Sequence, residues 1–115
     1  GSNDNTPNTL VVGTLSIDED LIPEVFALHQ NYPNPFNPTT QIKYDLPEDG
    51  LVTINIYDVM GRSIRTLVND NQSAGYRSVR WDATNNYGEA ISAGMYIYVI
   101  QAGEFRSTKK MVLLK

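Results

Sequence analysis

The spacing of apolar segments constrains the fold of this chain more than any other feature. From Glu24 onward, short apolar runs are separated by turn residues, and no helical periodicity develops. Regularly spaced short strands of this kind are typical of β-sandwiches and barrels. Because 115 residues suffice for one hydrophobic core but not two, the pattern predicts a single all-β domain over residues 24–115.

Apolar and polar residues alternate within two of these runs, residues 40–46 and 51–58. Alternation indicates strands that bury one face. Between them, residues 47–50 end in Asp-Gly, which favours a tight reversal, so we expect the two strands to form a hairpin. The residues expected to face the core are Ile42, Tyr44, Leu46, Val52, Ile54 and Ile56.

Further candidate strands follow, and the count of about seven favours an immunoglobulin-like antiparallel β-sandwich. Val79 and Trp81 share one face of their run, and Trp81, the sole tryptophan, is predicted to anchor the core. Residues 94–103 are apolar on both faces, which predicts a central strand covered on both sides. The remaining candidate strands are residues 25–30, at one edge, and residues 63–68, 76–82 and 104–115.

Residues 1–23 are interpreted as a linker. They are mostly polar, contain the acidic cluster Asp18 to Asp20, and hold one candidate short strand near Leu10 to Leu15. Gly1-Ser2 resembles a cloning remnant, so we expect the chain to be a fragment of a longer protein.

Charge and composition exclude several functions. A net charge of −4 and a pI near 4.8 argue against nucleic-acid binding, which depends on many contacts from lysine and arginine to phosphate. The chain has no cysteine, so disulfides and thiolate chemistry are excluded. Its apolar runs are far shorter than the roughly 20 residues of a membrane-spanning helix.

Three prolines stiffen the segment just before the strand at Thr40. Pro33, Pro35 and Pro38 fix their own φ angles, donate no backbone hydrogen bond, and bias the preceding residues towards extended conformations. The segment therefore suits a rigid crossover, with Tyr32 and Phe36 expected to pin it to the core. The alternative is a docking surface, because a rigid segment loses little entropy on binding.

Residues suited to catalysis do not form a convincing set. His29, the only histidine, has no nucleophile, metal-ligand or phosphate-loop pattern around it. The carboxylates near predicted turns are expected to be solvated or to form Asx turns. We therefore predict that the domain is not an enzyme. These carboxylates are Asp45, Glu48, Asp49 and Asp58.

The loop after Trp81 holds the one cluster of oxygen ligands around a glycine, Gly88. Carboxylate and amide oxygens bind calcium, but the spacing does not match a calcium-binding loop, and Asx turns explain the same residues. Both interpretations stay open, with no cofactor expected. The candidate ligands are Asp82, Asn85, Asn86 and Glu89.

The final residues, "KKMVLLK", place lysines on both sides of an apolar run. One interpretation is a last sandwich strand whose lysines protect an exposed edge from aggregation. The other is a tail presented for recognition, in which strand pairing supplies affinity. A free final strand would also allow dimerisation through that edge.

Four stretches in order, "NYPNPFNPTTQIKYDLP", "VTINIYDVMGR", "GYRSVRWDATNNYGEAISAGMYIYVI" and "KKMVLLK", together resemble the type A C-terminal sorting domain of the bacterial type IX secretion system. The resemblance covers residues 24–115. It implies an immunoglobulin-like domain that directs an attached upstream cargo through the periplasm and across the outer membrane to the cell surface or medium. The implied partners are an outer-membrane shuttle protein and a surface sortase that cuts between about Leu10 and Glu24.

The resemblance also implies where the recognition residues lie. The family's motifs fall on Pro33, Asn34, Pro35, Phe36, Ile56, Tyr57, Asp58, Gly61, Arg62, Gly94 and Tyr96, and the recognition tail falls on Lys109, Lys110, Met111, Val112, Leu113, Leu114 and Lys115.

A second resemblance leaves other functions open. Residues 79–100 are similar to the immunoglobulin-like domain of flagellar hook-capping proteins, which implies a structural spacer or an adhesion module. A carbohydrate-binding module is a third alternative, because exposed aromatic rings can stack on sugars. The candidate rings are Tyr32, Tyr57, Tyr76 and Tyr87.

Overall fold

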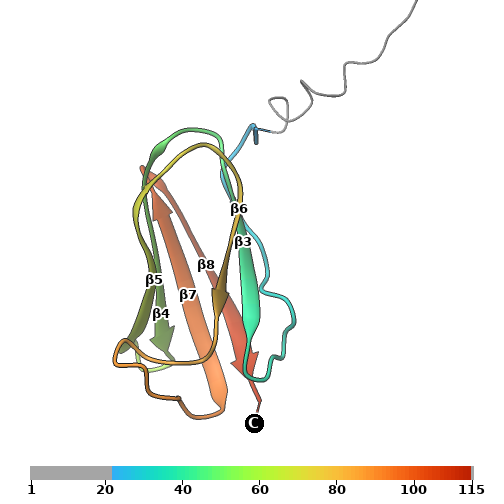
Figure 1. Cartoon of the computed structure of the whole chain (residues 1–115), viewed down its shortest axis with the longest axis vertical. Helices are drawn as coiled ribbons and strands as arrows, with labels where there is room; N and C mark the ends of the chain where they lie inside the picture. Colours follow the sequence, from blue (N-terminus) through green and yellow to red (C-terminus); the bar gives the residue numbers. More distant parts are fainter. Residues whose placement is uncertain (1–21, 115) are drawn as a thin grey trace, which may run out of the picture.

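The computed structural model describes residues 22–114, which form seven β-strands in two antiparallel sheets (Figure 1). The predicted immunoglobulin-like β-sandwich is confirmed. The candidate strand near Leu10 to Leu15 and the terminal Lys115 lie outside the described residues. The smaller sheet has the order β2 (Ala27–Leu28), β3 (Thr40–Leu46), β6 (Gly75–Trp81), and the larger sheet has the order β5 (Ser63–Gln72), β4 (Gly50–Asp58), β7 (Gly94–Ala102), β8 (Phe105–Leu113).

The predicted hairpin between residues 40–46 and 51–58 is wrong. β3 pairs with β2 and β6, whereas β4 pairs with β5 and β7. The turn at Pro47 to Asp49 carries the chain from one sheet to the other, so that the apolar face of each strand packs on a shared core. The predicted inward sets are nevertheless correct, because all six residues expected to face the core are at most 1% exposed.

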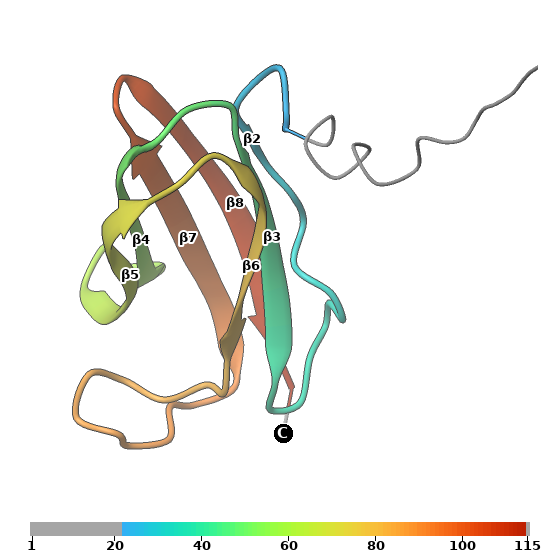
Figure 2. The same ribbon diagram turned by 45° about the horizontal axis from the view of Figure 1, so that its top comes forward.

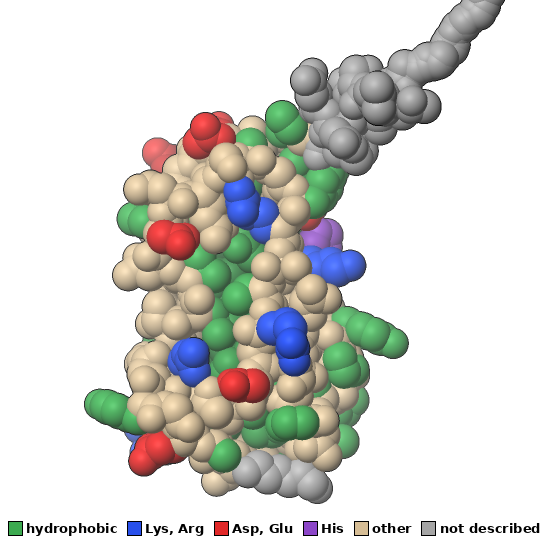
Figure 3. Space-filling view, viewed as in Figure 1, with side chains coloured by type: hydrophobic (Ala, Val, Ile, Leu, Met, Phe, Trp, Pro, Cys, Tyr) green, Lys and Arg blue, Asp and Glu red, His purple; other side chains and the backbone are tan. Residues whose placement is uncertain are grey.

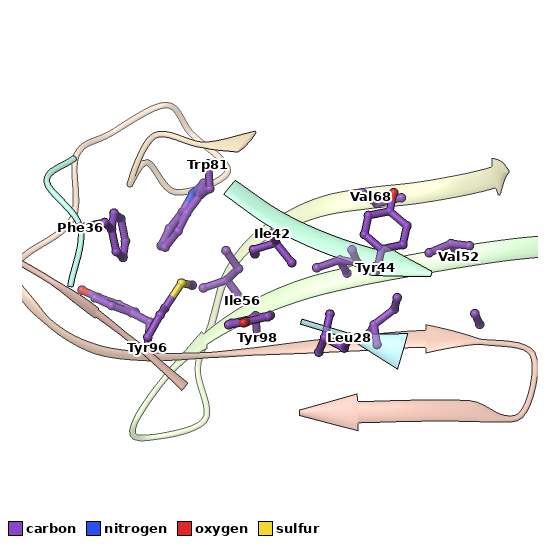
Figure 4. Close-up of a cluster of buried hydrophobic side chains, with 14 of the residues drawn as sticks. Leu28, Phe36, Ile42, Tyr44, Val52, Ile56, Val68, Trp81, Tyr96 and Tyr98 are labelled. Atoms are coloured by element: carbon purple, nitrogen blue, oxygen red, sulfur yellow. The ribbon is translucent and has the colours of Figure 1, made fainter. Parts of the chain in front are cut away.

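The core lies between the sheets, and its largest buried side chains are aromatic (Figure 4). Trp81 is 1% exposed, which confirms its predicted burial. Tyr44 and Tyr98 are buried further along the sandwich. On the side where β5 and β6 lie, hydrophobic side chains are visible in the seam between the sheets (Figure 3).

β7 is central in the larger sheet, as predicted, but it is not covered on both sides. Its inward residues Tyr96, Tyr98 and Ile100 are buried, whereas Met95 on the outward face is 45% exposed. Ile97 and Val99 on that face are only half-buried. Within residues 22–114 no second layer covers the outside of this sheet, which explains the difference.

The edges of the larger sheet are partly closed by other segments. On the β5 side, Asn86 donates its backbone N–H to the Ile64 carbonyl and accepts the Thr66 N–H at its side chain, both at 3.0 Å. At the opposite end of the sandwich, the rings of Phe26 and Phe105 stack with centroids 5.1 Å apart. Figure 2 shows β2 as a short strand beside β3, at the outer edge of the smaller sheet.

Residues 22–114 contain no helix long and apolar enough to cross a membrane.

Candidate functional site at the C-terminal end of the sandwich

Buried polar groups fix the start of the proline segment. The Tyr98 hydroxyl accepts the Asn31 backbone N–H and donates to the His29 carbonyl, both at 2.8 Å. The Asn31 side chain, 2% exposed as a residue, donates to Thr40 Oγ1 at 3.0 Å and to the Pro33 carbonyl at 3.1 Å. Burial raises the pKa of Tyr98 to about 12, so the hydroxyl stays protonated and can donate.

Tyr32 does not pin this segment, contrary to the sequence-based prediction. Its side chain is 81% exposed, whereas Phe36 is 1% exposed, as predicted. The backbone of Tyr32 pairs with Gln41 through two hydrogen bonds of 2.9 Å. Because neighbouring residues of a strand point to opposite sides, burial of Asn31 turns the Tyr32 ring outward. Asn31, Thr40 and Tyr98 were not predicted as site residues, because the sequence does not show which of these polar groups hydrogen-bond to one another.

The end of the proline segment caps the outer edge of β8. Phe36 donates its N–H to the Val112 carbonyl at 2.9 Å and accepts the Leu114 N–H at 2.8 Å. The Asn34 side chain accepts the Val112 N–H at 2.9 Å. The expectation of a free final strand is therefore wrong for the C-terminal part of β8, because these groups are already paired.

An aromatic cluster in the core packs against Phe36, which belongs to this cap. The Phe36 and Trp81 rings lie 5.8 Å apart, and Trp81 meets Tyr96 edge-on at 6.0 Å (Figure 4). Trp81 Nε1 donates to the Thr84 carbonyl at 2.9 Å, and the Tyr96 hydroxyl donates to the Ser92 carbonyl at 2.6 Å. Burial, aided by the nearby Asp58 charge, raises the pKa of Tyr96.

The predicted recognition tail alternates between the core and the surface. Met111 and Leu113 are 0% and 1% exposed, so they belong to the core. Lys110 is exposed, Val112 is half-buried, and Leu114 is 50% exposed. This second set forms the outward side of the tail, which a partner can contact while the domain is folded. Lys109 is half-buried.

The central family motif builds the turn between β4 and β5. Asp58 accepts the backbone N–H groups of Met60 and Arg62 at 2.9 Å, and Arg62 Nε binds its second carboxylate oxygen at 2.8 Å. The hydrogen bond from the Arg62 backbone, followed by its side chain and the Met60 backbone, lowers the pKa of Asp58. Gly61 has φ +85°, a conformation that other residues rarely adopt.

The remaining motif positions divide between core and surface. Ile56 is buried, and Tyr57 is half-buried on the outward face of the larger sheet. Gly94 opens β7 with φ +150° opposite Leu113 in β8. The turn between β4 and β5, the loop before β7 and the end of β8 all lie at one end of the sandwich (Figure 1). The fold thus gathers most of the motif positions around the tail.

The candidate calcium ligands are engaged within their own loop. Asn85 Oδ1 accepts the backbone N–H groups of Tyr87 and Glu89 at 2.9 and 3.0 Å, an Asx-type turn, and its amide donates to the Glu89 carboxylate. Asp82 accepts the Thr84 hydroxyl, which lowers the pKa of Asp82. Asn86 binds β5. The structure therefore supports the Asx-turn interpretation of these residues.

The other predicted polar residues are scattered. His29 Nε2 lies 3.0 Å from the Asp45 carboxylate on the surface of the smaller sheet. Asp49 accepts the Ala74 N–H at 2.8 Å at the opposite end of the molecule from Asp58. In residues 22–114 no three side chains of histidine, aspartate or glutamate come together as a metal site would require.

Fold and site together define an immunoglobulin-like β-sandwich domain whose last strand is held by a proline-rich segment. A family model for the FlgD Ig-like domain matches residues 35–104, more than half of the chain, so the chain belongs to that family. The matched region ends before β8. No curated protein matches the chain.

Several solved structures have a similar fold. Dimeric latent PorU from Porphyromonas gingivalis matches with a TM-score of 0.61 and 24% identity, over 80% of this chain and 9% of PorU. PorZ, an essential surface component of the type IX secretion system of the same organism, matches with a TM-score of 0.52 and 17% identity, over 90% of this chain and 12% of PorZ. FlgD from P. aeruginosa matches with a TM-score of 0.51 and 26% identity, over 64% of this chain and 57% of FlgD. The chain thus spans a small part of PorU and PorZ.

Proposed function

We propose that this domain is a C-terminal sorting signal that directs an attached cargo across the outer membrane through the type IX secretion system. In this proposal an outer-membrane shuttle protein recognises the domain, and a surface sortase removes it by cutting between about Leu10 and Glu24. The cargo then reaches the cell surface or the medium. The role is non-catalytic, and nucleic acid and cofactors take no part in it.

One observation carries the proposal: the residues outside the match to the FlgD Ig-like model pack against each other. Gln30 Nε2 donates to the Lys110 carbonyl at 2.7 Å, and Asn34 binds the Val112 N–H. These residues lie outside 35–104. Asn34, Lys110 and Val112 belong to the sequence motifs that resemble sorting domains, and Gln30 directly precedes the first of these motifs. The occurrence of the same fold in PorZ is consistent with the proposal.

The test fuses the whole chain to a periplasm-directed reporter in a bacterium with a type IX system. We expect release or surface display of the reporter. A triple variant, Lys110→Glu, Val112→Thr and Leu114→Ser, alters only the surface side of the tail and should leave the reporter in the periplasm. Retention of the unaltered fusion, in cells where a known sorting signal works, would contradict the proposal.

A spacer or assembly module is the second candidate, favoured by membership of the FlgD Ig-like family. Such a module would support its attached protein without being exported by the type IX system. Adhesion and carbohydrate binding are variants of this candidate. The side chains of Tyr32, Tyr76 and Tyr87 are 81%, 61% and 88% exposed and available for stacking on sugars. A glycan array with no bound sugar would remove the carbohydrate variant.

A further inference from the structure

The turn between β4 and β5 holds an apolar tip in water. Val59 and Met60 are 63% and 77% exposed. The tip is held rigidly, because Asp58 binds both the backbone and the side chain of Arg62 and accepts the Met60 N–H. Hairpin tips are usually polar. Here several hydrogen bonds and an ion pair instead fix the turn backbone that carries an exposed methionine.

A second exposed methionine faces this tip across a groove. Met60 and Met95 both line a groove of about 420 Å³ between the Asp58–Arg62 turn and the start of β7, with Ile64 and Ile91 among its other lining residues. Met95 is 45% exposed. Methionine side chains are flexible and polarizable, and they adapt to varied apolar partners.

The groove adjoins the outward side of the tail through Met95. Met95 lies opposite Val112 in the β7–β8 register, and Leu114 follows at 50% exposure. We call this surface, formed by Met60, Met95, Val112 and Leu114, the methionine groove. It brings exposed apolar side chains from a motif turn, a motif strand and the tail to one end of the sheet, beside the Asp58–Arg62 pair that also lines the groove. Exposed apolar side chains gathered in one place commonly mark protein interaction sites.

Charge at the rim indicates what the groove accepts. The Asp58 carboxylate is neutralised by Arg62, 2.8 Å away. Lys110 is exposed on the same face as Val112, and the two ion pairs found within residues 22–114 do not include it. Lys110 therefore places one positive charge beside Val112 on the outward face, and this charge complements a carboxylate on a partner.

We propose that the methionine groove is the docking surface for a protein of the secretion machinery, which inserts an apolar side chain between Met60 and Met95 and sets a carboxylate against Lys110. This inference rests on the proposed sorting function. It differs from a linear signal because residues from three separate parts of the chain form the contact.

The test uses the full-chain reporter fusion with the double variant Met60→Gln and Met95→Gln. Leu51→Gln is the matched control, since Leu51 is 54% exposed on β4 but lies at the other end of the strand. We expect export of the double variant to fall about tenfold, as loss of about 1.4 kcal/mol of binding would produce, with Leu51→Gln unchanged. Lys110→Glu should also reduce export, whereas Lys43→Glu on the smaller sheet should not.

The outcomes separate the two proposals. Normal export of the double variant, with the unaltered fusion exported, overturns the groove and leaves the sorting function standing. Retention of the unaltered fusion overturns both. Sedimentation of the purified chain tests whether a second copy of the chain occupies the groove instead. A dimer that the double variant abolishes would assign the groove to this second copy and overturn the proposal of a secretion partner. Circular dichroism and urea unfolding verify that each variant is folded.

Discussion

At the scale of single residues, the Tyr98 hydroxyl is the polar group on which the proline segment depends. It lies in the core yet satisfies two backbone groups, the Asn31 N–H and the His29 carbonyl. A buried backbone group that loses its partner costs free energy comparable to a lost hydrogen bond. The sequence offered no means of finding this link, because the partners are separated by more than sixty residues.

Tyr98→Phe should lower the free energy of unfolding by about 1 to 3 kcal/mol, since the Asn31 N–H remains buried without an acceptor. Urea unfolding followed by circular dichroism measures the change. Tyr76→Phe is the matched control, because the Tyr76 side chain is 61% exposed, and it should have no effect. Equal stability of Tyr98→Phe and the unaltered chain would contradict the assigned hydrogen bonds.

The raised pKa of Tyr98 also predicts that the domain loses stability at alkaline pH. Its pKa is raised to about 12 in the folded domain, against about 10 in an unfolded chain. Between these values the unfolded chain releases the proton while the folded domain retains it, so the free energy of unfolding falls as pH rises. Tyr98→Phe should show a shallower fall. Tyr44 and Tyr96, whose pKa values are also raised, remain in both proteins.

At the scale of elements, the proline segment closes the edge of β8. Asn34→Ala removes the acceptor of the Val112 N–H, a contribution of about 1 kcal/mol. Amide exchange at Val112 should therefore accelerate about fivefold. Exchange at Leu114, whose N–H binds the Phe36 carbonyl, should change less and serves as the internal control. Asn34→Asp keeps an acceptor and should preserve protection at Val112.

The loop after Trp81 is expected to keep its structure without calcium. Its Asn85 and Asp82 oxygens already accept hydrogen bonds within the loop. Extracellular calcium sites bind at millimolar concentrations or tighter. Adding millimolar calcium should therefore leave the melting temperature unchanged, as should a chelator. A calcium-dependent rise that Asn85→Ala abolishes would favour the calcium interpretation instead.

The sequence predicted where the strands lie better than it predicted which strands pair with each other. Alternation identified the inward faces of β3 and β4, because burial of one face imposes a period of two. It could not tell that the turn at Pro47 to Asp49 changes sheets, since turn residues are the same whether a chain pairs back or crosses over. The sequence also did not predict that Asn34 and Phe36 bind β8, because these residues are far from β8 in the sequence.

At the scale of the whole molecule, the tail is part of the core. Deleting Lys109–Lys115 removes the buried side chains of Met111 and Leu113, each worth about 2 to 5 kcal/mol. Because a domain of this size is stable by only about 5 to 15 kcal/mol, we expect the truncated chain to lose cooperative unfolding in urea. A cooperative transition near that of the intact domain would contradict the packing of β8. The outward triple variant should unfold nearly as the intact domain does.

The two-sided character of β8 has a further consequence. Lys110, Val112 and Leu114 are displayed together, in fixed spacing, only after Met111 and Leu113 have entered the core and the proline segment has closed over the edge. If a transport receptor contacts the outward residues, it binds only domains in which β8 has folded. A domain whose C-terminal strand is not yet folded would then not be recognised for export.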